Sequence, residues 1–186
     1  MIIDMPKTPS LVVREYDKTI EYWIEEMKLS DGLKTSVLNS EIVFIPCDYK
    51  DAPNAFTDHT YDFYNYCIQK AGFRVEICCE EQDFNQLEMC SLKVRLGRFF
   101  SVSSISGVIL WNIISGYIKD SIDYRLEKVT ENMEQVEEIP AYQSEPECSF
   151  SVIIRDTTGR YIEVFYDGPI SGMEEAGDQI KKITNE

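Results

Sequence analysis

The sequence predicts an α+β fold with a largely antiparallel sheet, one long central helix and two or three shorter helices. Two patterns predict this class: apolar residues alternate with polar ones in several short stretches, and elsewhere they recur every three or four positions. The expected order of elements is βαββαββαββα. No shift in composition divides the chain, so we expect residues 1–186 to form a single acidic domain.

A strand and a helix are predicted at the start of the chain. Apolar residues predict a strand at residues 10–16, and Asp17 offers an N-cap oxygen to the helix that follows. Gly32 is expected to end this helix. Its apolar side consists of Ile20, Trp23, Ile24 and Met27.

A hairpin and a second helix are predicted next. Residues 35–39 and 41–46 are apolar stretches on either side of a short polar turn, which predicts two antiparallel strands. Residues 48–57 contain proline, asparagine and several aspartates, which predicts a loop. The aromatic-rich residues 58–71 predict a helix, and Gly72 is placed to end it.

The middle of the chain predicts two more strands and the longest helix. Apolar and polar residues alternate over residues 73–79 and 92–96, and Gly97 is expected to form a bulge. A serine then precedes residues 105–136, which predict a helix of unusual length.

The last part of the chain predicts a hairpin and a short helix. Residues 149–155 and 160–166 flank a tight turn in which Gly159 would take a positive φ. Ser171 and Glu174 have the spacing of a capping box, which predicts that a C-terminal helix begins there.

The composition excludes several classes of partner. The chain holds 18 Lys and Arg residues against 33 Asp and Glu residues, which gives a formal net charge of −15. Nucleic acids and anionic membranes are bound through Lys and Arg, so we expect no direct nucleic-acid binding and no membrane binding. The longest apolar stretch, residues 105–118, is also shorter than the roughly 20 residues of a membrane span.

The chain is expected to act in the cytoplasm. Residues 1–7 lack the charged start and apolar run of a secretory signal. No two cysteines stand in a C-x-x-C spacing, so we expect reduced structural thiols rather than disulfides or metal ligands. The six cysteines are Cys47, Cys67, Cys78, Cys79, Cys90 and Cys148.

The most informative pattern is a row of six carboxylates in the second half of the long helix. Their spacings of 3, 4, 4, 3 and 4 residues place them within an arc of roughly 80°. We name this row the acidic stripe; it consists of Asp120, Asp123, Glu127, Glu131, Glu134 and Glu138. The opposite, apolar side consists of Ile118, Ile122, Leu126, Val129, Met133 and Val136.

The acidic stripe has two interpretations. It is either a solvated face that keeps the chain soluble or a contact surface for a basic partner. Charge runs are usually solvated faces, but three observations support a contact surface here: the acids share one stripe, the last 67 residues hold 16 acids against 6 bases, and the chain lacks obvious catalytic groups.

The leading hypothesis is therefore a non-enzymatic acidic inhibitor that binds a basic protein surface and needs no cofactor. A nucleic-acid-binding nuclease or a toxin has such a surface, and mimicry of a nucleic acid is part of the hypothesis. Immunity proteins for toxins and phage inhibitors of bacterial defence, including anti-CRISPR proteins, are of this physical type. A further hypothesis is a homodimer through the helix from Val108 to Ile118, which is apolar on nearly every side.

Motifs for catalysis are sparse. His59 is the only histidine, which excludes any site that needs two, and the chain has no Walker loop, G-x-G-x-x-G, H-E-x-x-H or G-x-S-x-G motif. An aromatic cluster is either core with partly exposed tyrosine tips or an interface patch. It consists of Phe56, Tyr61, Phe63, Tyr64 and Tyr66.

Two short stretches resemble a known enzyme family. Residues 11–29 look like the opening of vicinal-oxygen-chelate modules, the glyoxalase and bleomycin-resistance type, and residues 153–165 are similar to their closing hairpin. The resemblance implies a small metal- or ligand-binding protein in which Glu163 matches the family's metal-binding glutamate. The family's first-strand His or Gln ligand has no counterpart around Leu11.

Overall fold

The computed structural model describes residues 9–49, 51–89, 92–102, 105–133 and 145–185, with the backbone alone for residues 129–133. The strands are β1 (Ser10–Glu15), β2 (Ile42–Ile45), β3 (Cys47–Tyr49), β4 (Ala52–Ala55), β5 (Val75–Ile77), β6 (Val94–Ser101), β7 (Glu147–Arg155) and β8 (Tyr161–Pro169). The helices are α1 (Ile20–Glu26), α2 (Asp31–Leu38), α3 (Thr60–Ala71), α4 (Gly107–Met133) and α5 (Met173–Ile183), with short 3₁₀ turns η1 (Glu81–Asp83) and η2 (Ile170–Gly172).

Six of these strands form one sheet in the order β1-β8-β7-β6-β2-β5, and β3 and β4 form a separate hairpin. Within the sheet, β1 with β8, β8 with β7, and β6 with β2 are antiparallel. The pairs β7 with β6 and β2 with β5 are parallel. The predicted α+β class with a largely antiparallel sheet and one long helix is confirmed.

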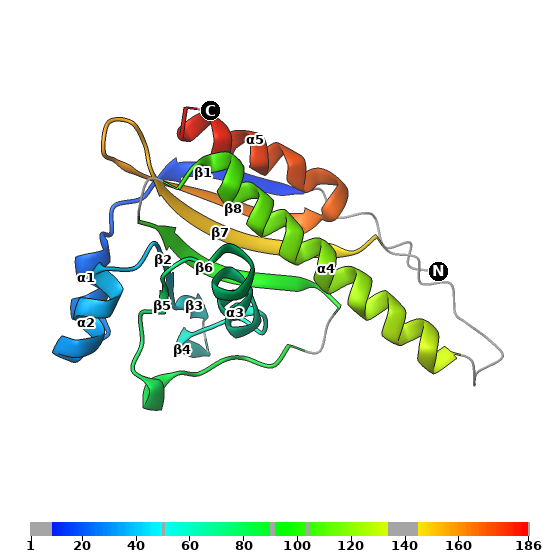
Figure 1. The fold of residues 1–186 in the computed structure, drawn as a ribbon, viewed down its shortest axis with the longest axis horizontal. Coiled ribbons are helices and arrows are strands. Elements are labelled where there is room, and N and C mark those ends of the chain that lie inside the picture. The colour runs from blue at the N-terminus through cyan, green and yellow to red at the C-terminus, as the bar shows by residue number, and fades with distance from the viewer. Residues whose placement is uncertain (1–8, 50, 90–91, 103–104, 134–144, 186) are drawn as a thin grey trace.

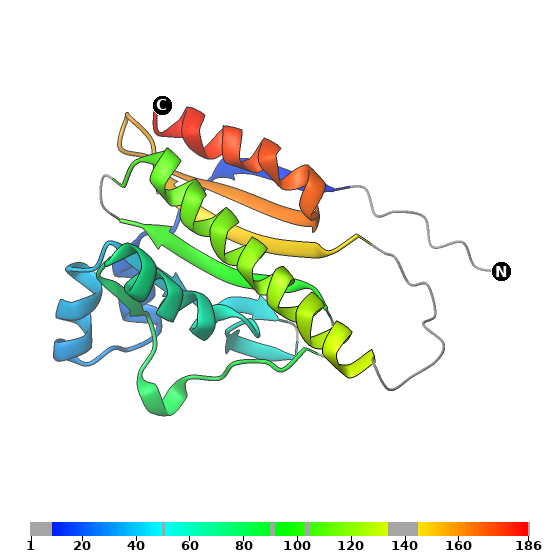
Figure 2. The ribbon, with the colours of Figure 1, turned by 45° about the vertical axis from the view of Figure 1, so that its right-hand side comes forward.

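Helices cover the sheet from both sides. Figure 2 shows α4 running diagonally across one face, with α5 on one side of it and α3 on the other. Under these helices lies the larger core, built around Phe44, Phe99 and Phe150 of the sheet. A smaller core on the opposite face joins α1 and α2 to the sheet, for example through Trp23 and Phe100. Burial on both faces explains why β2 is a continuous apolar run and why β7 contains the apolar run 152–154.

Helix α4 makes the connection between the parallel strands β6 and β7. A parallel pair needs such a crossover, because a tight turn can join only antiparallel strands. The Ser106 hydroxyl accepts a hydrogen bond from the Ile109 N–H at 3.4 Å, next to the start of α4. Trp111 and Ile114 are among the residues of its first turns that are buried on the sheet.

Several local predictions are wrong. Residues 35–39 were expected to form a strand but lie in or next to α2, whose inner side is anchored by the fully buried Val37. Gly32 accordingly lies inside α2 rather than ending α1. Residues 48–57 contain β3 and β4 instead of only a loop; Pro53 is tolerated there because a two-stranded hairpin leaves one edge of each strand unpaired.

Two glycines have the positive φ angles that their predicted positions require. Gly72 ends α3 with φ 67°, and Gly159 takes φ 88° in the turn between β7 and β8. Two predicted caps are not formed: α1 is capped by the Thr19 side chain instead of Asp17, and α5 begins after Gly172 without a side-chain cap. No helix among the described residues is both long enough and apolar enough to cross a membrane.

Gly97 forms the predicted bulge in β6. The register between β6 and β7 shifts between Arg95 and Arg98, and Gly97 takes φ 81° there. A Cβ atom at this position would lie 2.8 Å from Thr60 Oγ1 and 3.1 Å from Thr57 Oγ1. The bulge therefore brings β6 against the start of α3.

Replacing Gly97 by alanine should destabilise the fold. We expect Gly97→Ala to lower the free energy of unfolding by about 1–3 kcal/mol, since it combines a positive φ with a steric clash. Gly32→Ala is the control, because open space surrounds Gly32 inside a helix, and it should be neutral or stabilise by up to about 1 kcal/mol. Urea denaturation of both variants measures the difference, and equal stabilities would contradict the role given to Gly97.

Candidate functional site

The described part of the acidic stripe is exposed on α4. Asp120, Asp123 and Glu127 are all exposed, and within the described residues none of the three forms an ion pair. For Glu131 only the backbone is described, and it continues the same helix. Glu134 and Glu138 lie outside the described residues. The structure therefore brings at least three carboxylates of the stripe to the surface.

The predicted apolar side of α4 is buried near the middle of the helix and exposed further along it. Ile118 and Ile122 are buried as predicted, but Leu126 is 56% exposed, so its assignment to the core side is wrong. The reason is visible in Figure 1, where the last turns of α4 extend past the ends of the strands. Val129 and Met133 lie where only the backbone is described, and Val136 lies outside the described residues.

Arg125 ties this second half of α4 to the rest of the molecule. Its Nη1 donates to the Leu92 carbonyl oxygen at 2.7 Å, and its Nη2 contacts His59 Nε2 at 2.5 Å. Since a guanidinium only donates, Nε2 accepts and Nδ1 carries the proton, which it directs to the Tyr117 hydroxyl at 3.1 Å. Arg125 thus fixes α4 to the start of α3.

His59 is a structural side chain in this arrangement. It is 7% exposed, and burial together with the charges of Arg125 and Arg95 lowers its pKa to about 4. Both ring nitrogens are engaged, so the neutral ring has no nitrogen free for proton transfer or a metal. Next to it, burial raises the pKa of Asp58, whose Oδ2 lies 3.6 Å from Arg95 Nη1.

The aromatic cluster divides between core and surface. Phe56 and Phe63 are buried, whereas Tyr61 is 50% exposed and stacks on Tyr64 with ring centroids 5.7 Å apart. Tyr66 is partly exposed, and burial followed by the charge of Asp120 raises its pKa. The division fits a core with partly exposed tyrosine tips, whereas the interface patch stays a prediction. Tyr66 adjoins the acidic stripe at Asp120.

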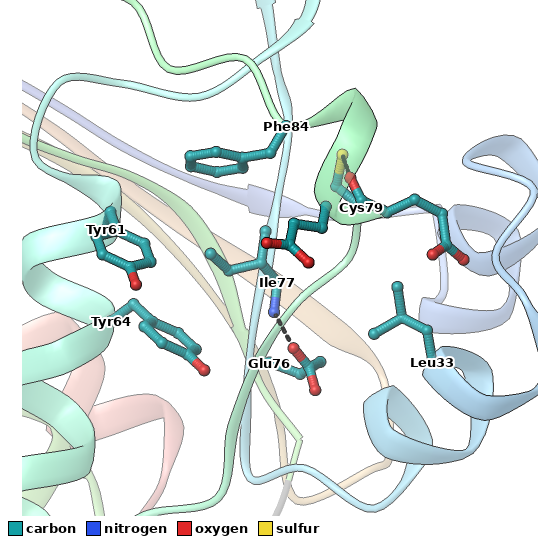
Figure 3. Close-up of a pocket in the computed structure, with 9 residues that line it drawn as sticks. Leu33, Tyr61, Tyr64, Glu76, Ile77, Cys79 and Phe84 are labelled. Carbon is teal, nitrogen blue, oxygen red and sulfur yellow. Dashed lines mark hydrogen bonds between the residues drawn. The ribbon is translucent and has the colours of Figure 1, made fainter.

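A pocket lies on the far side of α3 from the acidic stripe. It has a volume of about 600 Å³ and is formed by α2, α3, β5 and the η1 turn. Figure 3 shows Tyr61 and Tyr64 on one side of it, Leu33 on the other, and Phe84 and Glu76 at its two ends. The lining residues are Leu33, Tyr61, Tyr64, Glu76, Ile77, Cys79, Glu80, Glu81 and Phe84.

The sequence reasoning did not predict this pocket. A signal for it was present, because the polar side of the predicted strand at residues 73–79 carries Glu76 and the adjacent acids Glu80 and Glu81 follow it closely. Tyr61 and Tyr64 belong to the predicted aromatic cluster, but their neighbours across the pocket come from segments that only the fold brings together.

Glu163 is buried among cations rather than open to a ligand. Its side chain is 1% exposed, and its oxygens lie 2.6 Å from Arg14 Nε and 3.3 Å from Arg98 Nε. The Ser151 hydroxyl also donates to it at 2.6 Å. A metal ion bound by Glu163 would have to displace these guanidinium groups, and no group of three or more potential metal ligands occurs in the described part of the chain.

The described cysteines are free thiols with little nucleophilic character. Burial raises the pKa of Cys79 to about 11 and that of Cys67, Cys78 and Cys148 to about 12. Burial also raises the pKa of Cys47, despite the nearby Arg98. These thiols stay protonated near neutral pH, which fits structural roles. Cys90 lies outside the described residues.

The helix segment that was proposed as a homodimer contact is mostly buried in the core of its own chain. From Val108 to Ile118 its large apolar side chains pack on the sheet, except Val108 and Ile109, which are 42% and 50% exposed. A dimer through this segment remains a hypothesis that would depend on those two residues.

Comparisons of the chain with protein-family models, with curated proteins and with solved structures find no match.

The buried neutral His59 should make the stability depend on pH. The pKa of His59 is about 4 in the folded chain and near 6.5 when it is unfolded, so the unfolded chain binds more protons between these values. The free energy of unfolding should therefore fall as the pH falls from about 6.5 to 4, by at most about 1.4 kcal/mol per pH unit. His59→Gln, which keeps an acceptor for Arg125, should flatten this slope. Urea denaturation between pH 4 and 8 measures both profiles, and identical slopes would contradict the assignment.

We expect Glu163 to stabilise the fold and not to bind a metal ion. Glu163→Gln should lower the free energy of unfolding by about 3 kcal/mol, because it removes the buried carboxylate that faces Arg98 and leaves this partly buried guanidinium only the exposed Asp48 at 3.9 Å. Glu15→Gln is the control, since it breaks an exposed pair with Arg160 and should cost less than about 1 kcal/mol. Metal analysis completes the test: one bound divalent ion that is lost in Glu163→Gln would favour the vicinal-oxygen-chelate alternative.

Proposed function

We propose that this chain is a non-enzymatic interaction protein of the inhibitor type, which acts in the cytoplasm and binds a basic surface of another protein through the acidic stripe. The observation that carries the proposal is the set of exposed carboxylates Asp120, Asp123 and Glu127 on one side of α4, without ion pairs within the described residues. Because no described cation pairs with these carboxylates, their charges face solvent and are available to a partner.

The surroundings of the stripe support this proposal. Exposed like charges three or four residues apart on a helix cost a few tenths of a kcal/mol each. A basic partner removes that cost on binding, and the net charge of −15 speeds its approach. Partly exposed Tyr66 next to Asp120 adds the kind of side chain that is enriched at protein interfaces.

A partner whose own ligand is a nucleic acid fits best. Along α4 the carboxylates advance by about 4.5 Å or 6 Å per step, since the rise is 1.5 Å per residue. A nuclease or a toxin that binds phosphates with Lys and Arg presents cations in a comparable row. Toxin immunity proteins and anti-CRISPR proteins act on partners of this kind. The free thiols of the described cysteines suit a reducing cytoplasm.

The proposal is tested by reversing the charges of the stripe. The chain is used to capture partners from a host lysate at low salt, and the captured protein is purified and titrated against the wild type and the variant Asp120→Lys, Asp123→Lys, Glu127→Lys. We expect affinity that falls steeply with salt in the wild type and drops at least about 100-fold in the variant, because attraction becomes repulsion.

A control variant separates the contribution of the acidic stripe to affinity from that of the net charge. Glu21→Lys, Glu25→Lys, Glu26→Lys makes the same change of charge on exposed positions of α1, on the opposite face of the sheet. This variant should lose less than about tenfold in affinity through the long-range field alone. Equal losses in both variants, or unchanged affinity in the α4 variant, would refute the stripe as the contact surface.

A further inference from the structure

The pocket between α2, α3, β5 and η1 combines aromatic walls with uncompensated negative charge. Its nine lining residues include three aromatic rings and three glutamates, but no Lys, Arg or His. Within the described residues, Glu76, Glu80 and Glu81 form no ion pair. A concave site of this composition concentrates negative potential.

Two of the glutamates are held in place by neutral donors. Glu76 Oε2 accepts from the Ser36 hydroxyl at 2.5 Å, and its Oε1 accepts from the Ile77 N–H at 3.1 Å. Glu80 Oε1 accepts from the Ser30 N–H at 2.6 Å, and this bond lowers the pKa of Glu80. These contacts position the carboxylates without cancelling their charge, so they stay available to a cation.

The aromatic side of the pocket offers a matching surface. Tyr61 and Tyr64 stack with an interplanar angle of 17°, and Phe84 lies 6.3 Å from Tyr61 between ring centroids. Figure 3 shows Tyr61 and Tyr64 along one side, with Phe84 at the end next to Tyr61 and Glu76 at the other end, nearer Tyr64. A cation on such rings gains from their negative faces, while its apolar stem can lie along Ile77 and Leu33.

We infer that this pocket binds a guanidinium group, as an arginine side chain that enters from a partner. A guanidinium is planar, so it can lie flat on a tyrosine ring while its edge donates to a carboxylate, which a spherical ammonium cannot do. The inference rests on the proposed function only for the source of the arginine, the basic partner surface. It adds a second contact site, separated from the acidic stripe by α3.

The test uses the full chain and a small probe, N-acetyl-arginine amide, in a ¹H–¹⁵N NMR titration. We expect saturable shifts of backbone amides at residues 61–64 and 76–81. N-acetyl-citrulline amide has the same shape without the charge, and it should bind at least about tenfold more weakly. Equal binding of the citrulline probe, or shifts confined to other acidic surfaces, would overturn the inference. N-acetyl-lysine amide binding as tightly as the arginine probe would overturn the choice of a guanidinium.

Variants locate the site. Glu81→Gln and Tyr61→Leu should each weaken the arginine probe about five- to tenfold, whereas Tyr61→Phe keeps the ring and should retain binding. Glu21→Gln is the charge-matched control on α1 and should change nothing. Retained peak dispersion shows that each variant is folded, and full binding in both pocket variants would refute the site.

The two proposals can fail separately. The charge reversals at Asp120, Asp123 and Glu127 should leave the probe within about twofold of its wild-type affinity, because α3 lies between them and the pocket. Probe binding without partner binding would support the pocket and refute the stripe, and the reverse result would refute the pocket alone.

Discussion

The packing of α4 across the sheet is the interaction on which the other features depend. The parallel neighbours β6 and β7 require a crossover, and α4 supplies it while its first half buries Trp111 and Ile114 on the apolar face of the sheet. Because a helix buries only one side, the orientation that seats these residues also decides that Asp120, Asp123 and Glu127 face solvent. The exposed charge follows from the same packing that forms the core.

Buried ionisable groups are paired or neutral, whereas several exposed carboxylates have no ion-pair partner within the described residues. The buried carboxylate of Glu163 meets Arg14, Arg98 and the Ser151 hydroxyl, and the buried His59 stays neutral. This is what low polarity demands, since an unpaired buried charge costs several kcal/mol. On the α4 side and around the pocket, carboxylates lie in contact with water or neutral donors instead. The molecule therefore pairs or neutralises these buried groups, whereas the exposed carboxylates of α4 and the carboxylates of the pocket form no ion pair within the described residues.

Local patterns were sufficient to predict part of the fold. The turn at Gly159, the end of α3 at Gly72 and the long helix follow from short-range rules, and so does the acidic stripe, because helical periodicity is a local property. The strand prediction for residues 35–39 is wrong because β-branched Thr35 and Val37 favour a strand locally, whereas the burial of Val37 stabilises α2. The cluster around Glu163 and the pocket could not be predicted, since they join residues far apart in sequence. Arg14, for example, is 149 positions from Glu163.

The contacts of Arg125 have a consequence for the entropy of binding. The last turns of α4 leave the sheet, and a helix without tertiary contacts frays. Arg125, which lies between Asp123 and Glu127 in the sequence, holds this part of α4 through the Leu92 carbonyl and His59. The backbone that carries these acids is thus ordered before any partner arrives. A preorganised surface loses little conformational freedom on association, so more of the electrostatic attraction is expressed as affinity.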